Sequence, residues 1–335
     1  MLKFTPKISV IIPIYNDEMY LKDALLSVQQ QSFGNFECIC VNDGSVDNSE
    51  AIIDKFVAQD NRFIKINQEN QGVSGARNTG LDAAKGDYVF LMDHDDLIPK
   101  NTLKNLHDAA VKYNADMSRG RMMMIRENFA LNELHNGNSI GKFRYFDNPL
   151  TDFYKHIRGK YKSWVYIWQC LFKKSAIQNI RFVESLRSGG EDNLFMFEVI
   201  SKINDFVQID DIVACHRRSK TSITLNGFKS LLIDNYDIIV PYVYDEYATD
   251  SQVDKRLLWW VYRKVSYGTY RILIRDTIRS KNVDFYEHSR RQFLKFKGKP
   301  EFDKIYKRWS CRQKFFYSLF MSRKYKLLQK LSFIL

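Results

Sequence analysis

Residues 7–14 read KISVIIPI, a nearly continuous apolar run rich in β-branched side chains. Such a run is typical of a strand buried on both faces of a parallel sheet. Asn16 or Asp17 can cap a following helix, because apolar residues recur at helical spacing from Tyr20 to Val28. The chain therefore opens with a strand followed by a helix.

The same alternation of strand and helix continues along the first hundred residues. Further strands are predicted at residues 36–41, 63–66 and 88–93, and helices at residues 47–56, 73–84 and 99–113. This order favours a right-handed α/β unit with a mainly parallel central sheet. Farther on, the pattern predicts a strand at residues 121–125 and a buried helix that opens at Glu191 and Asp192.

Polar segments follow three of these strands directly. They are Tyr15 to Asp17, Asp43 to Ser45, and Asp93 to Asp95. In an open parallel sheet, ligands bind outside the carboxyl ends of the strands, so the three segments are expected at one edge. The sequence therefore predicts one pocket with an aromatic ring, an isolated carboxylate and an acidic pair.

The acidic pair Asp93 and Asp95 suggests a metal-diphosphate site. Carboxylates at the end of a buried strand are costly unless they are paired or bound to a cation, and Mg²⁺ or Mn²⁺ take oxygen ligands. The alternative is a solvated turn that caps the helix after it. The carboxylates of Glu191 and Asp192 pose the same choice, because acidic residues are favoured in the first turn of any helix.

The basic residues are concentrated at the C-terminal end. Residues 250–335 hold 22 Lys and Arg against 7 Asp and Glu, whereas the preceding 249 residues hold 29 against 32. Large aromatic residues are interleaved with these basic ones, which suits helices at an anionic membrane surface. A basic helical extension that packs on the preceding α/β domain or forms an oligomer interface is the alternative.

The cysteines and the apolar runs bear on localisation. Five cysteines without a Cys-x-x-Cys pair fit reduced thiols in a cytoplasmic protein. Residues 1–7 lack the apolar core of a signal peptide, and no apolar stretch approaches the roughly 20 residues that span a bilayer. We therefore expect a cytoplasmic protein, peripheral on the inner face of the cytoplasmic membrane.

Six segments in order resemble the inverting family 2 glycosyltransferases with the GT-A fold, enzymes of bacterial polysaccharide and glycoconjugate synthesis. The matching segments are Ile8 to Asn16 (SVIIPxYN), Val41 to Asp47 (VDDGSxD), Asn70 to Gly80 (NxGxsxARNxG), Asp93 to Asp96 (DxDD), Ser188 to Asp192 (GED) and Arg217 to Ser222 (RxxxxS). The resemblance covers roughly residues 7–225. It implies a GT-A catalytic domain at residues 1–225 and a helical basic region at residues 226–335.

The resemblance also implies roles in donor binding. Pro13 and Tyr15 would shape and face the base, and Asp43 would accept a hydrogen bond from uracil N3–H, which favours a UDP-sugar. Arg77 would neutralise the diphosphate. Arg217 and Ser222 would clamp it through a loop that orders when the donor binds.

For catalysis, the resemblance implies Mn²⁺ or Mg²⁺ bound by Asp95, with Asp93 on the ribose or a metal-bound water. His216, which stands where related sequences often carry tyrosine, is either a third metal ligand from a C-terminal loop or a hydrogen-bonded structural residue. Asp192 would be the general base and Glu191 would position it or the acceptor.

The expected function is metal-dependent transfer of a sugar from a nucleotide-sugar to a hydroxyl of a glycan or lipid-linked acceptor, as in capsule or lipopolysaccharide synthesis. The rivals are a non-catalytic sugar-nucleotide-binding protein and a binder of nucleic acid or another anionic surface through the basic tail. No Gly-x-Gly-x-x-Gly or P-loop motif is present, which disfavours dehydrogenases and P-loop enzymes. No nucleic-acid partner is expected, and oligomer formation is left open.

Overall fold

The computed structural model describes residues 5–134, 143–147, 149, 166–186, 190–218 and 309–330, with residues 287, 290, 291, 294, 303, 306 and 307. The chain divides into two compact units, one of residues 1–187 and 191–222, the other of residues 188–190 and 223–335. Ser222 and most of the expected region 226–335 lie outside the described residues. The expected domain division therefore stays a prediction.

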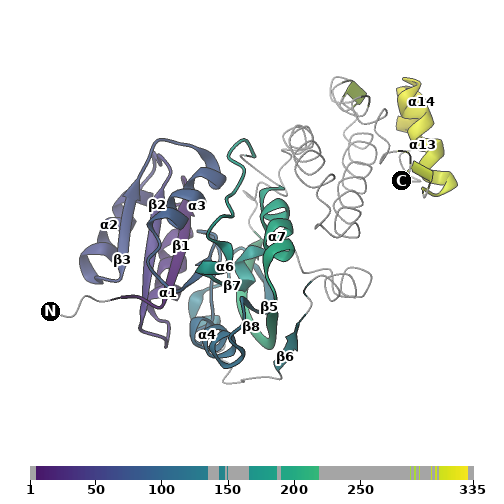
Figure 1. Cartoon of the computed structure of the whole chain (residues 1–335). Coiled ribbons are helices and arrows are strands. Elements are labelled where there is room, and N and C mark those ends of the chain that lie inside the picture. The colour runs from purple at the N-terminus through teal and green to yellow at the C-terminus, as the bar shows by residue number, and fades with distance from the viewer. Residues whose placement is uncertain are drawn as a thin grey trace. The chain divides into compact units, whose positions relative to one another are not determined.

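The first unit is built on an eight-stranded mixed sheet in the order β3-β2-β1-β4-β7-β5-β8-β6 (Figure 1). Its strands are β1 (Ile8–Ile14), β2 (Phe36–Asn42), β3 (Phe63–Asn67), β4 (Tyr88–Leu91), β5 (Met117–Arg126), β6 (Phe143–Phe146), β7 (Cys170–Lys173) and β8 (Phe206–Arg218). Strands β1 to β4 pair in parallel, as expected. Strand β7 lies antiparallel between β4 and β5, and β6 lies antiparallel to β8.

The helices of this unit follow the strands closely. They are α1 (Leu21–Gln29), α2 (Ser49–Gln59), α3 (Gly72–Ala83), α4 (Thr102–Tyr113), α6 (Lys174–Ile177) and α7 (Glu191–Lys202), with short 3-10 turns η1 (Leu131–Glu133) and η2 (Ile167–Gln169). Each of the first three helices links two parallel strands, which is the connection that such strands need.

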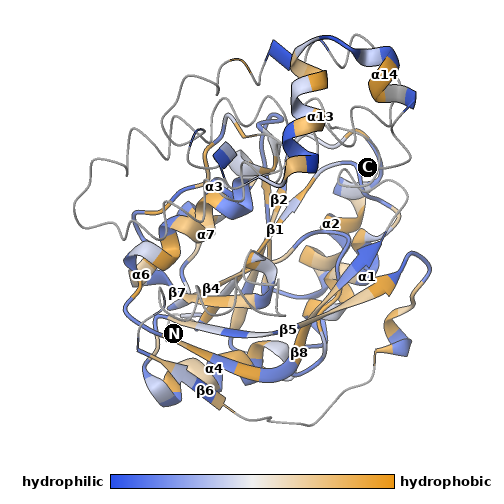
Figure 2. Cartoon of the chain, turned by 90° about the vertical axis from the view of Figure 1, so that its right-hand side faces the viewer, coloured by the Kyte–Doolittle hydropathy of each residue, from blue (hydrophilic) through white to orange (hydrophobic). Residues whose placement is uncertain are grey.

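Hydrophobic residues cover both faces of the sheet, and its central strands carry the hydrophobic colour in Figure 2. Every residue of β1 is buried. Its even-numbered side chains join one core with α1, α2 and α4. On the other face Ile11 of β1 meets α3 at Gly80, and Phe172 of β7 contacts Phe195 of α7. The sheet is therefore covered by helices on both sides, and its loops carry the polar segments.

Two local expectations are corrected. Strand β4 ends at Leu91, and residues 93–96 form a turn in which Asp96 N–H donates to Asp93 C=O at 3.3 Å. The acidic pair therefore lies in a turn after the strand and not within the strand itself. Neither Asn16 nor Asp17 caps α1 with its side chain. Asn16 Oδ1 instead accepts a hydrogen bond from Val46 N–H, and Asp17 N–H donates to Ser49 Oγ, both in the segment after β2.

In the second unit, the described helices are α13 (Cys311–Met321) and α14 (Tyr325–Lys330). Ser310 caps α13, since its hydroxyl accepts a hydrogen bond from Gln313 N–H at 3.2 Å. Phe316 and Phe320 of α13 are buried, whereas Phe315 is exposed. In the parts of the chain that the structure describes, no helix is both long and apolar enough to span a bilayer.

Candidate active site

The loops after β1 and β2 lie against each other at the carboxyl ends of the strands. Asn16 N–H donates to Ser45 Oγ at 3.2 Å, and Val46 N–H donates to Asn16 Oδ1 at 2.8 Å. Asn16 has φ of +50°, a conformation that asparagine tolerates better than most residues. Tyr15 is 47% exposed beside this junction, while Pro13 is buried within β1 opposite Val41. The first two polar segments therefore meet as expected.

Asp43 is a buried carboxylate at the end of β2, only 2% exposed. Its Oδ1 accepts hydrogen bonds from Gln68 Nε2 at 2.7 Å and from Gln71 N–H at 2.8 Å, and its Oδ2 accepts one from Gly72 N–H at 2.8 Å. The two backbone donors open α3, where a negative charge is favoured. Because a carboxylate has about four acceptor positions, one position on Oδ2 stays available to a ligand.

Asp93 and Asp95 differ in their surroundings, although they are two residues apart. Asp93 Oδ1 accepts a hydrogen bond from Arg77 Nη2 at 2.7 Å. Burial alone would raise the pKa of Asp93, but Arg77 lowers it below the ordinary value. Burial raises the pKa of Asp95, whose carboxylate accepts no hydrogen bond from another residue in the described part of the chain. Apart from the contact with its own backbone N–H, the Asp95 carboxylate is thus left for a cation.

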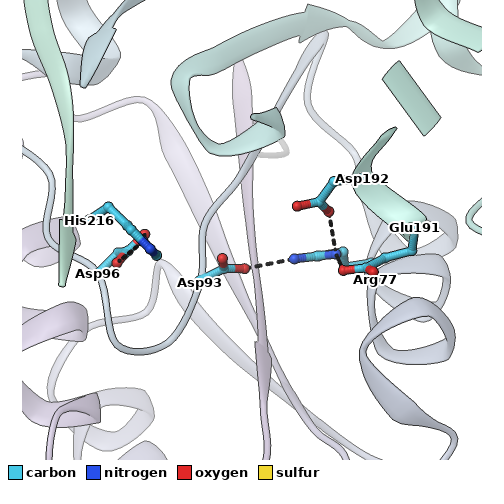
Figure 3. Close-up of polar contacts among 6 residues, drawn as sticks. All are labelled: Arg77, Asp93, Asp96, Glu191, Asp192 and His216. Carbon is cyan, nitrogen blue, oxygen red and sulfur yellow. Dashed lines mark hydrogen bonds and ion pairs between the residues drawn. The ribbon is translucent and has the colours of Figure 1, made fainter. Parts of the chain in front are cut away.

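Arg77 joins the acidic turn after β4 to the first turn of α7 (Figure 3). Its Nη1 lies 2.9 Å from Asp192 Oδ1 and 3.2 Å from Glu191 Oε1, while Nη2 contacts Asp93. Burial raises the pKa of Asp192 well above the usual carboxylate range, and Glu191 and Asp93 act in the same direction against the charge of Arg77. A raised pKa makes a carboxylate a stronger base.

Buried Asp96 and partly exposed His216 form a second pair, seen at the left of Figure 3. His216 Nδ1 lies 3.0 Å from Asp96 Oδ1, which also accepts a hydrogen bond from Arg217 N–H at 2.9 Å. Burial lowers the pKa of His216, but the hydrogen bond and charge of Asp96 raise it to about 9. The imidazole stacks on Trp168 with ring centroids 5.1 Å apart.

The structure places His216 and Arg217 in a strand where the sequence suggested a loop, and it adds Asp96 to the candidate site. His216 and Arg217 lie in β8 and not in a C-terminal loop, because β8 pairs in parallel with β5 as far as Arg218. Asp96, to which the sequence reasoning gave no role, orients His216; its only signal was its place as the fourth residue of Asp93 to Asp96. The part of the clamp assigned to Ser222 lies outside the described residues.

Arg217 is 2% exposed and bridges several backbone carbonyls. Its Nε donates to Asp95 C=O at 3.0 Å, and its Nη1 donates to the carbonyls of Glu127 and Phe129. Its Nη2 is buried and has no hydrogen-bond partner within the described residues. One nitrogen of this buried guanidinium therefore lies next to the acidic turn without an acceptor among the described residues.

The donor set suits a divalent cation, although no group of three His, Cys, Asp or Glu residues in the described part of the chain is arranged as a metal site. Asp93 and Asp95 supply the carboxylate oxygens that Mg²⁺ and Mn²⁺ prefer. Asp96 holds His216 by Nδ1, as a second residue does for many metal-binding histidines, and a metal ion at Nε2 would displace the proton that the raised pKa keeps on the ring. These three residues therefore fit such an ion chemically.

The fold and these acidic strand ends define a nucleotide-sugar-type transferase, and comparison with known proteins gives its family. The family model for glycosyl transferase family 2 matches residues 9–180. The chain belongs to this family and is a glycosyltransferase, and the expected GT-A fold is confirmed.

Two curated relatives and two solved structures illustrate the similarity. Glycosyltransferase GlyA of Streptococcus pneumoniae serotype 4 is 31% identical over 65% of this chain and 31% of its own length. The GalNAc(5)-diNAcBac-PP-undecaprenol beta-1,3-glucosyltransferase of Campylobacter jejuni is 30% identical over 57% of this chain and 59% of its own length. The chain thus matches less than two thirds of either relative.

Crystal structures of S. aureus TarS resemble this fold. One covers 97% of this chain and 55% of TarS at 18% identity with a TM-score of 0.62. The TarS complex with UDP-GlcNAc covers 88% of this chain and 92% of that one at 17% identity, with a TM-score of 0.55. At this identity the similarity concerns the fold.

Proposed function

We propose that this chain is a metal-dependent inverting glycosyltransferase that moves a sugar from a UDP-sugar to a hydroxyl of a glycan or lipid-linked acceptor. The observation that carries the proposal is the bridge through Arg77, which joins Asp93 at the end of β4 to Asp192 at the start of α7. The carboxylate that binds the donor, Asp93, and the carboxylate that acts as general base, Asp192, thereby contact the same guanidinium. The TarS complex with UDP-GlcNAc supports the donor class through the shared fold.

The donor is bound through its base and its diphosphate. The available acceptor position on Asp43 Oδ2 suits the N3–H of uracil, and the exposed ring of Tyr15 suits stacking on the base. Pro13 fixes the strand end that carries Tyr15. Nη2 of Arg217 donates to the diphosphate, with Ser222 as a second donor.

Asp95, Asp93 and His216 would hold Mn²⁺ or Mg²⁺. When bound, such an ion would supply positive charge beside the leaving diphosphate, and that group would then need no proton donor. The carboxylates of the site favour such a cation, because Asp93, Glu191 and Asp192 surround the guanidinium of Arg77 and Asp95 lies two residues from Asp93.

Asp192 accepts the proton of the acceptor hydroxyl. The acceptor oxygen forms its bond to the anomeric carbon as the bond from that carbon to the UDP oxygen breaks on the opposite face, and the configuration inverts. Glu191, held by the same Nη1 of Arg77, positions the acceptor or Asp192. A general base of this kind contributes about 10²–10⁴-fold to the rate.

The second unit attaches the enzyme to an anionic membrane surface, where a lipid-linked acceptor of capsule, lipopolysaccharide or related glycan synthesis is presented. Exposed Phe315 of α13 and Leu327 of α14 stand among the basic residues Arg312, Lys324 and Lys326. Apolar and basic side chains together suit an interfacial helix. The relative from Campylobacter jejuni, whose name includes an undecaprenol-linked glycan, supports the acceptor class. This attachment places the protein peripherally on the inner face of the cytoplasmic membrane.

A donor screen tests the proposed function. Purified protein with Mn²⁺ is mixed with UDP-, GDP- and dTDP-sugars, and thermal shift and nucleotide release are recorded. We expect UDP-sugars to raise the melting temperature and to release UDP when acceptor is present. A clear response to another nucleotide without any response to UDP-sugars would overturn the assignment of Asp43.

Liposome flotation tests the membrane role. The full chain is expected to float with anionic vesicles and to stay in the dense fraction with neutral ones. A truncation ending near residue 250 lacks the basic segment and should lose flotation. If it floats as well as the full chain, the membrane role is wrong.

A further inference from the structure

The guanidinium of Arg77 contacts three carboxylates of the protein. Arg77 lies on α3, and its Nη1 and Nη2 contact Asp192, Glu191 and Asp93 at 2.9, 3.2 and 2.7 Å (Figure 3). The side chain is 3% exposed, and the ring of Phe182 lies 5.1 Å from its Cζ. A guanidinium with its edge and one face covered in this way is closed to a bound diphosphate.

The local charge leads to the same conclusion. Three carboxylates surround one guanidinium, so at neutral pH the cluster has no positive excess to attract an anion. A planar guanidinium can hold several carboxylates in fixed directions, which a lysine ammonium does not do. Arg77 therefore has the chemistry of a bridge between acidic side chains.

The helix that carries Arg77 is itself fixed to the segment before α7. Ser74 Oγ donates to Leu186 C=O at 2.6 Å. Asn78 exchanges two hydrogen bonds with the backbone of Phe182, at 2.9 Å to its C=O and 2.8 Å from its N–H. These buried hydrogen bonds involve residues on either side of Arg77 in the sequence and fix the position of its Cα. The guanidinium can therefore fix the positions of the carboxylates that it contacts.

We propose that Arg77 is a positioning residue for sugar transfer: it fixes the base Asp192 relative to the donor-side carboxylate Asp93, and it does not bind the diphosphate. This inference rests on the proposed function and replaces the diphosphate role that the sequence suggested for Arg77. The positioning role predicts that a change at Arg77 affects the catalytic rate and the binding of the donor differently. Loss of the bridge lowers kcat and leaves donor binding unchanged.

The size of the effect follows from the geometry of general-base catalysis. A displacement of about 1 Å in a reacting group costs about 10²-fold in rate. In Arg77→Lys the ammonium keeps the charge but cannot hold Asp93 and Asp192 together. We expect kcat to fall about 10²-fold, while KM for the UDP-sugar and the Kd for UDP stay within about threefold of wild type.

A matched control is available at the other end of the sheet. Arg62 pairs with Asp60 through Nε at 3.0 Å and Nη2 at 2.7 Å, and it precedes β3, far along the strands from their carboxyl ends. Arg62→Lys removes a comparable two-bond contact of arginine with a carboxylate. It should leave kcat, KM and the Kd for UDP unchanged.

A double-mutant cycle tests whether Arg77 acts through Asp192. If it does, Arg77→Lys combined with Asp192→Asn should be no slower than Asp192→Asn alone. Should circular dichroism show Arg77→Lys unfolded, Phe182→Leu removes the ring beside the guanidinium. That variant should lower kcat several-fold at unchanged UDP affinity.

The outcomes separate this inference from the proposed function. An active wild type whose Arg77→Lys variant binds UDP tenfold more weakly at unchanged kcat would overturn the positioning role only. Additive losses in the double variant, or wild-type kcat in Phe182→Leu where that variant is used, would also overturn it. A wild type that binds and turns over no nucleotide-sugar removes the proposed function itself, and the inference with it.

Discussion

The substitution Asp43→Asn is predicted to destabilise the protein before any donor is present. The carboxylate accepts three hydrogen bonds, from the Gln68 side chain and from the backbone N–H groups of Gln71 and Gly72. An asparagine keeps one acceptor oxygen, so its amide nitrogen must face at least one of these donors. The change therefore removes a hydrogen bond to a charged acceptor and the negative charge at the start of α3.

The magnitude follows from these two losses. A hydrogen bond to a charged group contributes about 1.5–3 kcal/mol, and a charge at a helix N-terminus adds about 0.3–1 kcal/mol. We expect the free energy of unfolding, measured by urea titration, to fall by about 2–4 kcal/mol. The thermal upshift produced by UDP should be lost in the same variant.

Asp47→Asn is the control. Asp47 also accepts two backbone hydrogen bonds, from Ser49 at 3.0 Å and Glu18 at 2.9 Å, but in a more exposed loop. Water and the asparagine oxygen can replace the lost acceptor there, so the cost should be below about 1 kcal/mol. Equal losses in the two variants, or an unchanged Asp43→Asn, would refute the reasoning.

Three further predictions concern packing, pH and metal. A Cβ on Gly80 would lie 2.2 Å from Ile11 Cγ2, so Gly80→Ala should cost about 1–3 kcal/mol by denaturant titration, whereas Gly34→Ala, with no atom within 4 Å, should be nearly neutral. Burial lowers the pKa of His107, so the unfolded chain takes up the proton at a higher pH than the folded chain does, and the free energy of unfolding decreases as the pH is lowered through the ordinary histidine pKa. His107→Asn should therefore flatten the decline in stability measured from pH 8 down to pH 5, and an unchanged slope would contradict this. EDTA should abolish transfer and added Mn²⁺ or Mg²⁺ restore it, with Asp95→Asn needing a higher metal concentration; full activity in EDTA would exclude the metal.

The sequence predicted the first four strands and the helices between them, because their apolar residues recur with clear strand or helix spacing. Strands β1 to β4 are short apolar runs separated by helical periods, and each was predicted to within a residue or two of its bounds. The insertion of β7 between β4 and β5 depends on pairing between distant segments. Strand β8 mixes buried and exposed residues and shifts register against β5, so no simple alternation reveals it.

The same distinction holds for the candidate site. Asp43 and Asp93 were expected at one edge because each follows a parallel strand. The contact of Asp96 with His216 joins residues 120 apart in the chain, and that of Arg77 with Asp192 joins residues 115 apart. Such contacts have no local signal, so the sequence alone predicted neither the bridge from Arg77 to Asp192 nor the contact of His216 with Asp96.

The measurement that tests the central claim most directly is the kcat of Asp192→Asn with UDP-sugar, metal and acceptor, beside its affinity for UDP. Because the general base is removed and the donor contacts at Asp43 and Asp95 are kept, kcat should fall by about 10²–10⁴-fold while the Kd for UDP stays within about threefold. Since burial raises the pKa of Asp192, the wild-type rate should also fall with decreasing pH at a pH above the ordinary carboxylate range. A variant that transfers sugar at the wild-type rate would contradict the assignment of Asp192 as the base.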